Sequence, residues 1–358
     1  MTVLVVNCGS SSLKWAVVDP DSGETLAKDT VQRVTDHGEA LRTVLARGPL
    51  DGLAAVAHRV VHGGERYAAP VLINDAVLDS IRDLSVLAPL HNPVNALGIE
   101  VARRVLPELP HIAVFDTAFH ATLPPHAYTY AVPRAWGVRR YGFHGTSHAY
   151  VSRAAARLLG RDVEGFKVIV LHLGNGASAT AVASGRSLDT SMGLTPLEGL
   201  VMGTRSGDVD PALVLQVRRT RNLSTDEIDA VLNSRSGLLA LAGDNDMREV
   251  HRRIAAGDAA AVLALEVYCY RIKKYVGAYL AALGGADAIA FTAGVGENDM
   301  AVRAHSLAGL EALGIAVDPE RNAAGGPVIS PPGSPVSVLV VPTDEELEMA
   351  TQAAALLT

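Results

Sequence analysis

One pattern occurs twice along this chain, and it constrains the fold more than any other feature. Residues 3–19 read VLVVNCGSSSLKWAVVD, and residues 168–184 read VIVLHLGNGASATAVAS. Each copy has an apolar run, a turn of small residues and a second apolar or alternating run, which predicts a strand, a tight loop and a strand. An alignment without gaps places Val3, Val5, Gly9, Ala16 and Val17 on Val168, Val170, Gly174, Ala181 and Val182. We therefore predict two related α/β halves, although two hairpins with coincidental valines would give a similar pattern.

Composition limits the class of protein. The chain has 358 residues, 49% hydrophobic and 19% charged, which predicts two well-buried domains. A net charge of −7 argues against a nucleic-acid partner. No apolar run reaches the roughly 18 residues that span a bilayer, and the N-terminus does not resemble a signal peptide. Two distant cysteines suit a reducing compartment. We expect a cytoplasmic enzyme with no membrane partner.

The pattern of apolar runs and turn residues predicts the domain boundary. A helix beginning near residue 147, with Ser147 as its cap, would separate a domain of residues 1–148 plus 343–358 from one of residues 149–342. We expect strands at 53–61, 112–115, 288–292 and 336–341, and helices at 93–106, 260–283 and from 344 onward. Thr343-x-x-Glu346 matches a capping box, which would leave the Glu345 carboxylate free for a ligand.

Three glycine-rich loops each follow a predicted strand: Gly9-Ser10-Ser11-Ser12, Gly174-Asn175-Gly176 and Gly294-Val295-Gly296. Loops of this kind direct several backbone N–H groups at one point, which suits a phosphate. None of them is a Walker A loop. Gly174-x-Gly176-x-x-Ala179 fits a dinucleotide fingerprint, but that motif opens a helix, and residues 180–185 predict a strand and a hairpin turn. Lys14 could supply a charge to phosphates or be a solvated strand lysine.

Two arginines and a histidine stand out as polar groups in apolar or glycine-rich surroundings. Arg59 lies within LAAVAHRVVHGG, where a charge must be paired or face a cleft. Arg205 lies in the glycine-bracketed segment MGTRSGD. Both could clamp a carboxylate and a phosphoryl group, or both could form internal ion pairs, for example with Asp116 and Asp208. His144 precedes the helix predicted at 147, so we interpret it as a loop histidine that donates a hydrogen bond to a developing anion rather than as a zinc ligand.

Longer motifs give the chain a family resemblance. The segments are NCGSSSLK at 7–14, HRVVHGG at 58–64, FDTAFH at 115–120, YGFHGTSH at 141–148, HLGNG at 172–176, GTRSGD at 203–208 and TDEE at 343–346. As an ordered set they resemble the acetate kinase family of the actin and sugar-kinase superfamily. The resemblance implies two similar actin-like, ribonuclease H-like domains around a nucleotide cleft, and a homodimer. It also implies reversible, Mg²⁺-dependent transfer of a phosphoryl group from ATP to acetate, giving acetyl phosphate and ADP, with Mn²⁺ as a possible substitute.

The same resemblance assigns site residues position by position. Asn7 and Glu345 would hold the metal, Arg59 would bind the carboxylate, and His144 and Arg205 would stabilise the transferring phosphoryl group. The substrate methyl would be surrounded by Val61, Leu90, Phe143 and Pro196. The nucleotide would contact Ser10, Ser12, Lys14, His172, Leu173, Gly174, Asn175, Gly176, Asp246, Met247, Arg248, Gly294, Val295, Gly296, Glu297 and Asn298.

Asp116 is the catalytic acidic residue implied by the family. A metaphosphate-like transition state needs positioning and positive charge rather than a base. We therefore expect Asp116 to act through the metal and its waters, or by orienting Arg59 and His144. Val61, rather than a smaller residue, favours acetate over propionate. One methylene is worth only about 1–3 kcal/mol of discrimination, so propionate should be a poorer substrate rather than a non-substrate. Two alternatives stay open: a kinase for propionate or butyrate, and an actin-like ATPase that changes conformation and phosphorylates no small acid.

Overall fold

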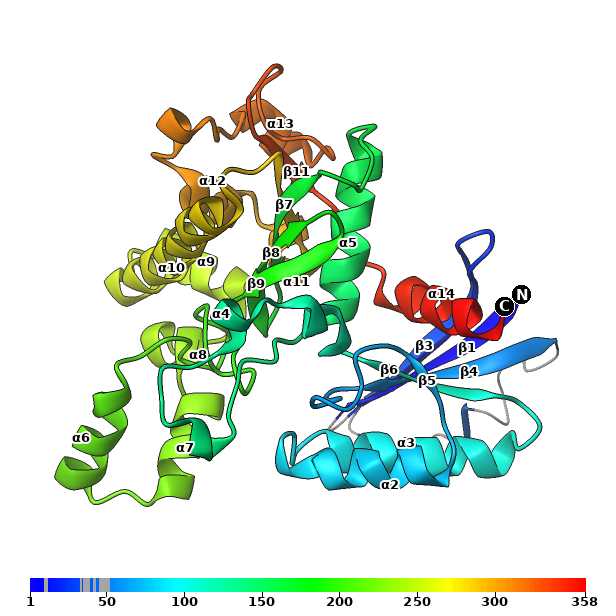
Figure 1. Ribbon diagram of the computed structural model, residues 1–358. Helices are drawn as coiled ribbons and strands as arrows, with labels where there is room; N and C mark the ends of the chain where they lie inside the picture. The colour runs from blue at the N-terminus through cyan, green and yellow to red at the C-terminus, as the bar shows by residue number, and fades with distance from the viewer. Residues whose placement is uncertain (10–11, 33, 35–38, 41–42, 45–51) are drawn as a thin grey trace. The chain divides into compact units, whose positions relative to one another are not determined.

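The computed structural model describes residues 1–358 except 10–11, 33, 35–38, 41–42 and 45–51. The chain divides into two compact units (Figure 1). Unit 1 comprises residues 1–121, 143–150 and 344–358, and unit 2 comprises residues 122–142 and 151–343. The chain therefore crosses between the units within one helix, α5 (Gly145–Leu158), and the stretch 122–142 belongs with unit 2.

Unit 1 is built on a six-stranded sheet with the order β3-β2-β1-β4-β6-β5. β1 (Thr2–Cys8), β2 (Ser12–Asp19) and β3 (Glu24–Gln32) are antiparallel, whereas β4 (Leu53–Val60) and β6 (His111–Phe115) run parallel to β1. The short β5 (Val71–Leu72) pairs antiparallel at the edge. Helix α14 (Glu345–Leu357) packs its buried face on one side of this sheet, and α3 (Asn92–Val105) packs on the other (Figure 1).

Unit 2 repeats this topology. Its sheet has the order β11-β10-β7-β8-β9, in which β7 (Lys167–Leu173), β8 (Ala177–Ala183) and β9 (Arg186–Thr190) are antiparallel. β10 (Ala288–Thr292) and β11 (Ser337–Val340) run parallel to β7. The order matches β6-β4-β1-β2-β3, so the predicted duplication is confirmed.

The alignment without gaps is correct only as far as the loop. Val3 faces Val18 in the first hairpin, whereas Val168 faces Val182 in the second. The first loop is therefore one residue longer, and Val182 corresponds to Val18 rather than to Val17. Because side chains alternate between the two faces of a strand, a slip of one residue exchanges those faces.

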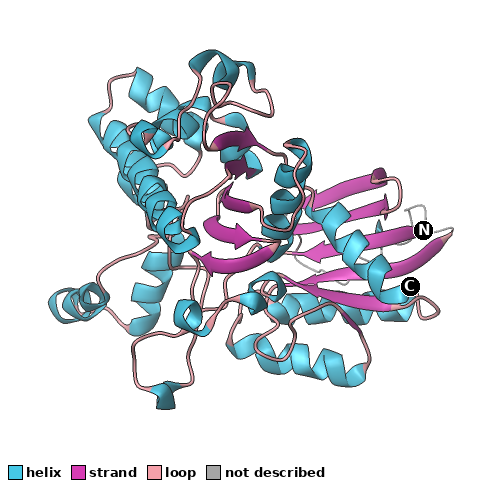
Figure 2. Ribbon diagram, turned by 45° about the horizontal axis from the view of Figure 1, so that its top comes forward, coloured by secondary structure: helices cyan, strands magenta, loops and turns pink. Residues whose placement is uncertain are grey.

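Helices cover the sheets of both units (Figure 2). The long helix α10 (Ala259–Leu283) lies against the sheet of unit 2 and ends at Gly284, whose φ of 65° stops the helix. No helix in the described ranges is long and apolar enough to cross a membrane. The remaining helices and 3₁₀ turns are α2 (Asp75–Asp83), η1 (Leu84–Val86), η2 (Ala118–Thr122), α4 (Pro125–Tyr128), η3 (Arg134–Trp136), α6 (Pro211–Arg221), α7 (Thr225–Ser234), α8 (Gly237–Ala242), α9 (Met247–Ala255), α11 (Ala293–Asn298), α12 (Met300–Leu307), η4 (Glu311–Leu313) and α13 (Pro319–Ala324).

Three local predictions were wrong. α5 begins at Gly145, so Ser147 lies in its first turn and does not cap it. Asp344 caps α14 by accepting from the Leu347 amide, so the expected capping box at Thr343 is absent. The glycine-rich segment 294–298, predicted as a loop, is the helix α11.

Candidate active site

The carboxyl ends of the central strands of unit 1 bring together the polar residues that the sequence singled out. Asn7 lies near the end of β1 and faces Lys14 on β2, and Arg59 lies near the end of β4. Asp116 follows the last residue of β6. Ligands bind at this edge of open α/β sheets, because loops of different strands converge there.

Arg59 and Asp116 form a two-pronged ion pair. The Arg59 Nε donates to Asp116 Oδ1 at 2.9 Å, and Nη2 donates to Oδ2 at 2.5 Å. A third nitrogen, Nη1, donates to Asn7 Oδ1 at 3.2 Å. Burial alone would lower the pKa of Arg59, but the attraction of Asp116 outweighs it and holds the pKa above its ordinary value. The Asp116 side chain is 1% exposed, so the pair fixes the arginine against a buried anchor.

Glu345, the first residue of α14, joins this group. Its Oε2 accepts from Thr146 Oγ1 at 3.4 Å. Burial raises the pKa of Glu345, and the attraction of Arg59 only partly opposes this. The site therefore offers a partly desolvated carboxylate that a cation would stabilise.

His144 sits at a strained turn before α5. Its φ of 56° is left-handed, which is uncommon for a residue with a side chain. The next residue, Gly145, donates its amide to the Asp116 carbonyl at 2.9 Å, and a Cβ there would lie 2.2 Å from that oxygen. Only glycine allows this close approach, which ties the His144 turn to the end of β6. Strain held by the surrounding structure is a common property of functional turns.

The predicted acyl-pocket residues differ in exposure. Val61 and Phe143 are buried at 7% and 2% exposure, and the Val61 amide donates to Asn95 Oδ1 at 3.1 Å. Leu90, in the turn before α3, is 70% exposed. Pro196 belongs to unit 2 and is half-buried.

Arg205 differs from Arg59 in having no carboxylate partner among the described residues. Its Nη1 donates to the Pro196 carbonyl at 3.3 Å and approaches Met202 Sδ at 3.7 Å, and both acceptors are neutral. Burial lowers the pKa of Arg205. A desolvated guanidinium without a counter-ion is prepared to bind an anion, since binding would supply the missing charge. The two arginines thus differ: Arg59 forms an internal ion pair, whereas Arg205 forms none with the residues that the structure describes.

A pocket of about 910 Å³ in unit 2 collects many of the residues predicted to contact a nucleotide. Its volume is within the range of small-molecule sites. One wall includes Gly174 and Asn175 of the second glycine-rich loop. There the Gly203 amide donates to the Asn175 carbonyl at 2.9 Å, and Asn245 donates to Asn175 Oδ1 at 3.0 Å. The predicted residues that line it are Gly174, Asn175, Asp246, Met247, Arg248, Gly294, Val295 and Asn298.

Several predicted nucleotide contacts lie elsewhere. Leu173 is fully buried, His172 is 7% exposed, and neither lines the pocket, nor do Gly176, Gly296 and Glu297. Ser10 lies outside the described residues. Ser12, the first residue of β2, ends the first glycine-rich loop, and Lys14 lies two residues further along β2; both belong to unit 1.

Sequence reasoning missed part of the pocket wall. The pocket is also lined by Tyr268 on α10 and by the pair His251–Asp299, whose side chains are joined at 2.7 Å. In the sequence these residues show no pattern beyond that of an ordinary helix surface. The other missed residues are Gly203, Leu238, Asn245, Met300 and Ala301. Of these residues, only Asn245 could have been found from the sequence, because it directly precedes the predicted nucleotide contact Asp246.

The duplicated fold defines a two-unit α/β protein of the actin-like class, with a glycine-rich loop in the wall of a pocket of small-molecule size. Comparison with known proteins gives the family. The Acetokinase family model matches residues 39–351, and the chain belongs to this family.

Curated and solved relatives agree over nearly the whole chain. The acetate kinase of Leifsonia xyli is 55% identical over 98% of both chains, and that of Streptomyces coelicolor is 53% identical over 99% of this chain and 97% of its own. The crystal structure of Porphyromonas gingivalis acetate kinase matches with a TM-score of 0.94 at 40% identity over 100% of both chains. A propionate kinase from Francisella tularensis matches with a TM-score of 0.91 at 40% identity over 98% of both.

Proposed function

We propose that this protein transfers the γ-phosphoryl group of ATP to the carboxylate of acetate, reversibly, giving acetyl phosphate and ADP. One observation of the site supports the proposal: in the described part of the chain Arg205 is a desolvated guanidinium without a carboxylate partner, two residues beyond Gly203 in the wall of the nucleotide-sized pocket. An actin-like ATPase that phosphorylates no small acid would also use such a cation at the transferring phosphoryl group. The argument against that alternative is the similarity to acetate kinases over nearly the whole chain.

The residues divide the work of an in-line transfer. Arg205 and His144 would stabilise charge on the equatorial oxygens of a loose transition state, which is the main requirement of phosphoryl transfer. Arg59 would hold the acetate carboxylate, and its remaining donor capacity at Nη1 is shared with Asn7. Because both oxygens of Asp116 accept from Arg59, we assign Asp116 the role of orienting this arginine rather than that of a base.

The oxygen donors of unit 1 fit a divalent cation. Asn7 Oδ1 has a second lone pair beyond its bond from Arg59, and Glu345 is a desolvated carboxylate. No cluster of three or more acidic, histidine or cysteine ligands occurs in the described ranges. This matches Mg²⁺, which uses one or two side chains with water and phosphate oxygens, and Mn²⁺ would use the same donors. When bound, the cation would neutralise charge on the nucleotide phosphates.

We expect acetate to be the preferred acid, because the buried side chains of Val61 and Phe143 would restrict the length of the acyl chain. Propionate is the second candidate, because the Francisella tularensis relative is described as a propionate kinase. We also expect the protein to be cytoplasmic and to form a homodimer. Sedimentation of the purified protein would test the homodimer.

Trapping of acyl phosphate with hydroxylamine tests the proposal. Purified protein is incubated with Mg-ATP and acetate, propionate or butyrate in parallel. More hydroxamate from acetate than from the others is the expected result. More product from a longer acid would overturn the specificity, and ATP hydrolysis without product from any acid would overturn the kinase assignment.

A further inference from the structure

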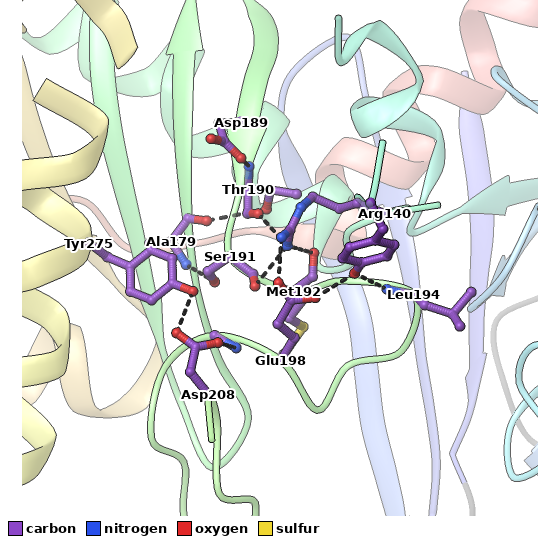
Figure 3. Close-up of polar contacts among 12 residues, drawn as sticks. Arg140, Ala179, Asp189, Thr190, Ser191, Met192, Leu194, Glu198, Asp208 and Tyr275 are labelled. Atoms are coloured by element: carbon purple, nitrogen blue, oxygen red, sulfur yellow. Dashed lines mark hydrogen bonds and ion pairs between the residues drawn. The ribbon is translucent and has the colours of Figure 1, made fainter. Parts of the chain in front are cut away.

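The loop after β9 carries both Pro196 and Arg205, and a partly buried polar cluster holds its first half. This cluster consists of Tyr130, Arg140 and Glu198, all in unit 2. Figure 3 shows Arg140 and Glu198 beside the start of the loop. Tyr130 and Arg140 come from the stretch 122–142, which is distant in sequence from the loop. The cluster lies outside the site residues considered so far.

Arg140 gathers the backbone at the start of the loop. Its Nη1 donates to three successive carbonyls, of Thr190 at 3.0 Å, Ser191 at 3.1 Å and Met192 at 2.9 Å. Its Nη2 donates to Glu198 Oε1. The arginine is 14% exposed, and the glutamate supplies its counter-charge.

Glu198 closes the cluster from the other side. Its Oε2 accepts from the Tyr130 hydroxyl, which in turn accepts from the Leu194 amide at 3.0 Å. There is no spare room here: a Cβ on Gly193 would lie 1.9 Å from Glu198 Oε2 and 2.2 Å from the Tyr130 hydroxyl. The loop from residue 190 to residue 198 is therefore tied at both ends to one guanidinium and one carboxylate.

This cluster connects to the anion-binding arginine through the backbone. Glu198 is two residues from Pro196, and the Pro196 carbonyl accepts from Arg205 Nη1 at 3.3 Å. Pro196 thus has its position set on one side by Glu198 and positions the Arg205 guanidinium on the other. A misplacement of about 1 Å in a catalytic group can cost about a hundredfold in rate.

We propose that Glu198 is a positioning residue for phosphoryl transfer, which with Arg140 and Tyr130 holds the Pro196 carbonyl where it aims the Arg205 guanidinium. The inference rests on the proposed function, because it assumes that Arg205 acts on the transferring phosphoryl group. It adds that aiming this arginine depends on a partly buried cluster, none of whose three residues lines the nucleotide-sized pocket.

The test compares Glu198→Gln with a control of similar structural cost. Ser330→Ala removes the buried bond that Ser330 Oγ accepts from the Val338 amide of β11 at 3.1 Å, and neither residue belongs to the loop. For each variant, kcat, the KM values for ATP and acetate, and the free energy of unfolding are measured. We expect Glu198→Gln to lower kcat about tenfold to a hundredfold with little change in the KM for ATP, and Ser330→Ala to keep kcat.

A double variant separates positioning from stability. Arg140→Met with Glu198→Gln removes the unpaired charge, so it should recover part of the stability lost in Glu198→Gln. Its kcat should stay low, because nothing then holds the loop. Recovery of kcat together with stability, or an unchanged kcat in Glu198→Gln, would overturn the inference. A wild-type protein that forms no acyl phosphate would instead overturn the proposed function, and the inference with it.

Discussion

Substitution of Arg59 or Arg205 by methionine should lower the activity in both cases but should change the free energy of unfolding to different extents. Arg205→Met removes a desolvated charge whose two recorded partners are neutral, at 3.3 and 3.7 Å. The lost hydrogen bond is worth about 1 kcal/mol, and relief from desolvation offsets it. We therefore expect the free energy of unfolding to stay within about 1 kcal/mol of wild type. Because removing one donor to developing charge costs about 10²–10³ in rate, kcat should fall by that factor.

Arg59→Met should instead destabilise the protein. It strands the Asp116 carboxylate, which is 1% exposed and bonded to Arg59 at both oxygens. Breaking a buried pair by removing one partner costs about 3–5 kcal/mol. The activity should also fall, through a higher KM for acetate, because the carboxylate loses its ligand.

Urea unfolding and the hydroxamate assay measure both effects. Arg218→Met, at an exposed position in the last turn of α6, is the matched control and should change neither quantity. A loss of more than about 3 kcal/mol in Arg205→Met would mean that this arginine has an internal ion-pair role. That result would refute the contrast between the two arginines and the argument for Arg205 as the phosphoryl ligand.

Three further outcomes follow from local geometry. Val61→Ala should narrow the preference for acetate over propionate by about 1–3 kcal/mol in kcat/KM, and an unchanged ratio would contradict the pocket assignment. In Gly203→Ala the new Cβ would lie 2.0 Å from Asn175 Oδ1, so the KM for ATP should rise, whereas Gly277→Ala has open space and should not alter it. Burial lowers the pKa of His62 to about 4, so the unfolded state binds more protons between about pH 6.5 and 4. The free energy of unfolding should therefore fall as the pH falls through that window, by up to about 3 kcal/mol, and an equal slope in His62→Phe would contradict this cause.

The sequence predicted the elements whose signals are local. Apolar runs bounded by turns gave the strands, and the helix at 260–283 ended at Gly284 as expected. The segment 294–298 was interpreted as a loop because glycine disfavours helices. Its helix is stabilised by a side chain of the next helix: the Arg303 guanidinium of α12 donates to the Gly296 and Glu297 carbonyls at 3.0 and 2.9 Å. No local pattern carries that contact.

The candidate site shows the same division. The motifs named Arg59 and Arg205 as charges in unusual surroundings, but could not say which one is paired. Pairing depends on which strand ends meet, and β4 brings Arg59 beside β6, where Asp116 follows. The first half of the loop that carries Arg205 is held instead by Arg140 and Glu198, which are 58 residues apart in sequence.

The duplication explains an unexpected result for Glu297. From the strand registers, Thr292 and Thr343 of unit 2 correspond to Arg59 and Asp116 of unit 1. Both halves must tie the ends of two parallel strands. Unit 1 does so with an ion pair, whereas in unit 2 Glu297 Oε1 accepts from Thr292 Oγ1 at 3.4 Å and from the Thr343 amide at 3.2 Å.

Glu297 should therefore brace the fold rather than bind ATP, contrary to the role that the family resemblance implies. Its Oε1 also accepts from the Ala293 amide at 2.8 Å, at the start of α11. Glu297→Gln exchanges charge-assisted bonds for weaker ones, so we expect a loss of about 1–3 kcal/mol in the free energy of unfolding and a KM for ATP within about twofold of wild type. Asn298→Ala, one residue further and in the pocket wall, should show the reverse. If Glu297→Gln raised the KM for ATP tenfold without loss of stability, its carboxylate would be a nucleotide ligand, and the two halves would not share this brace.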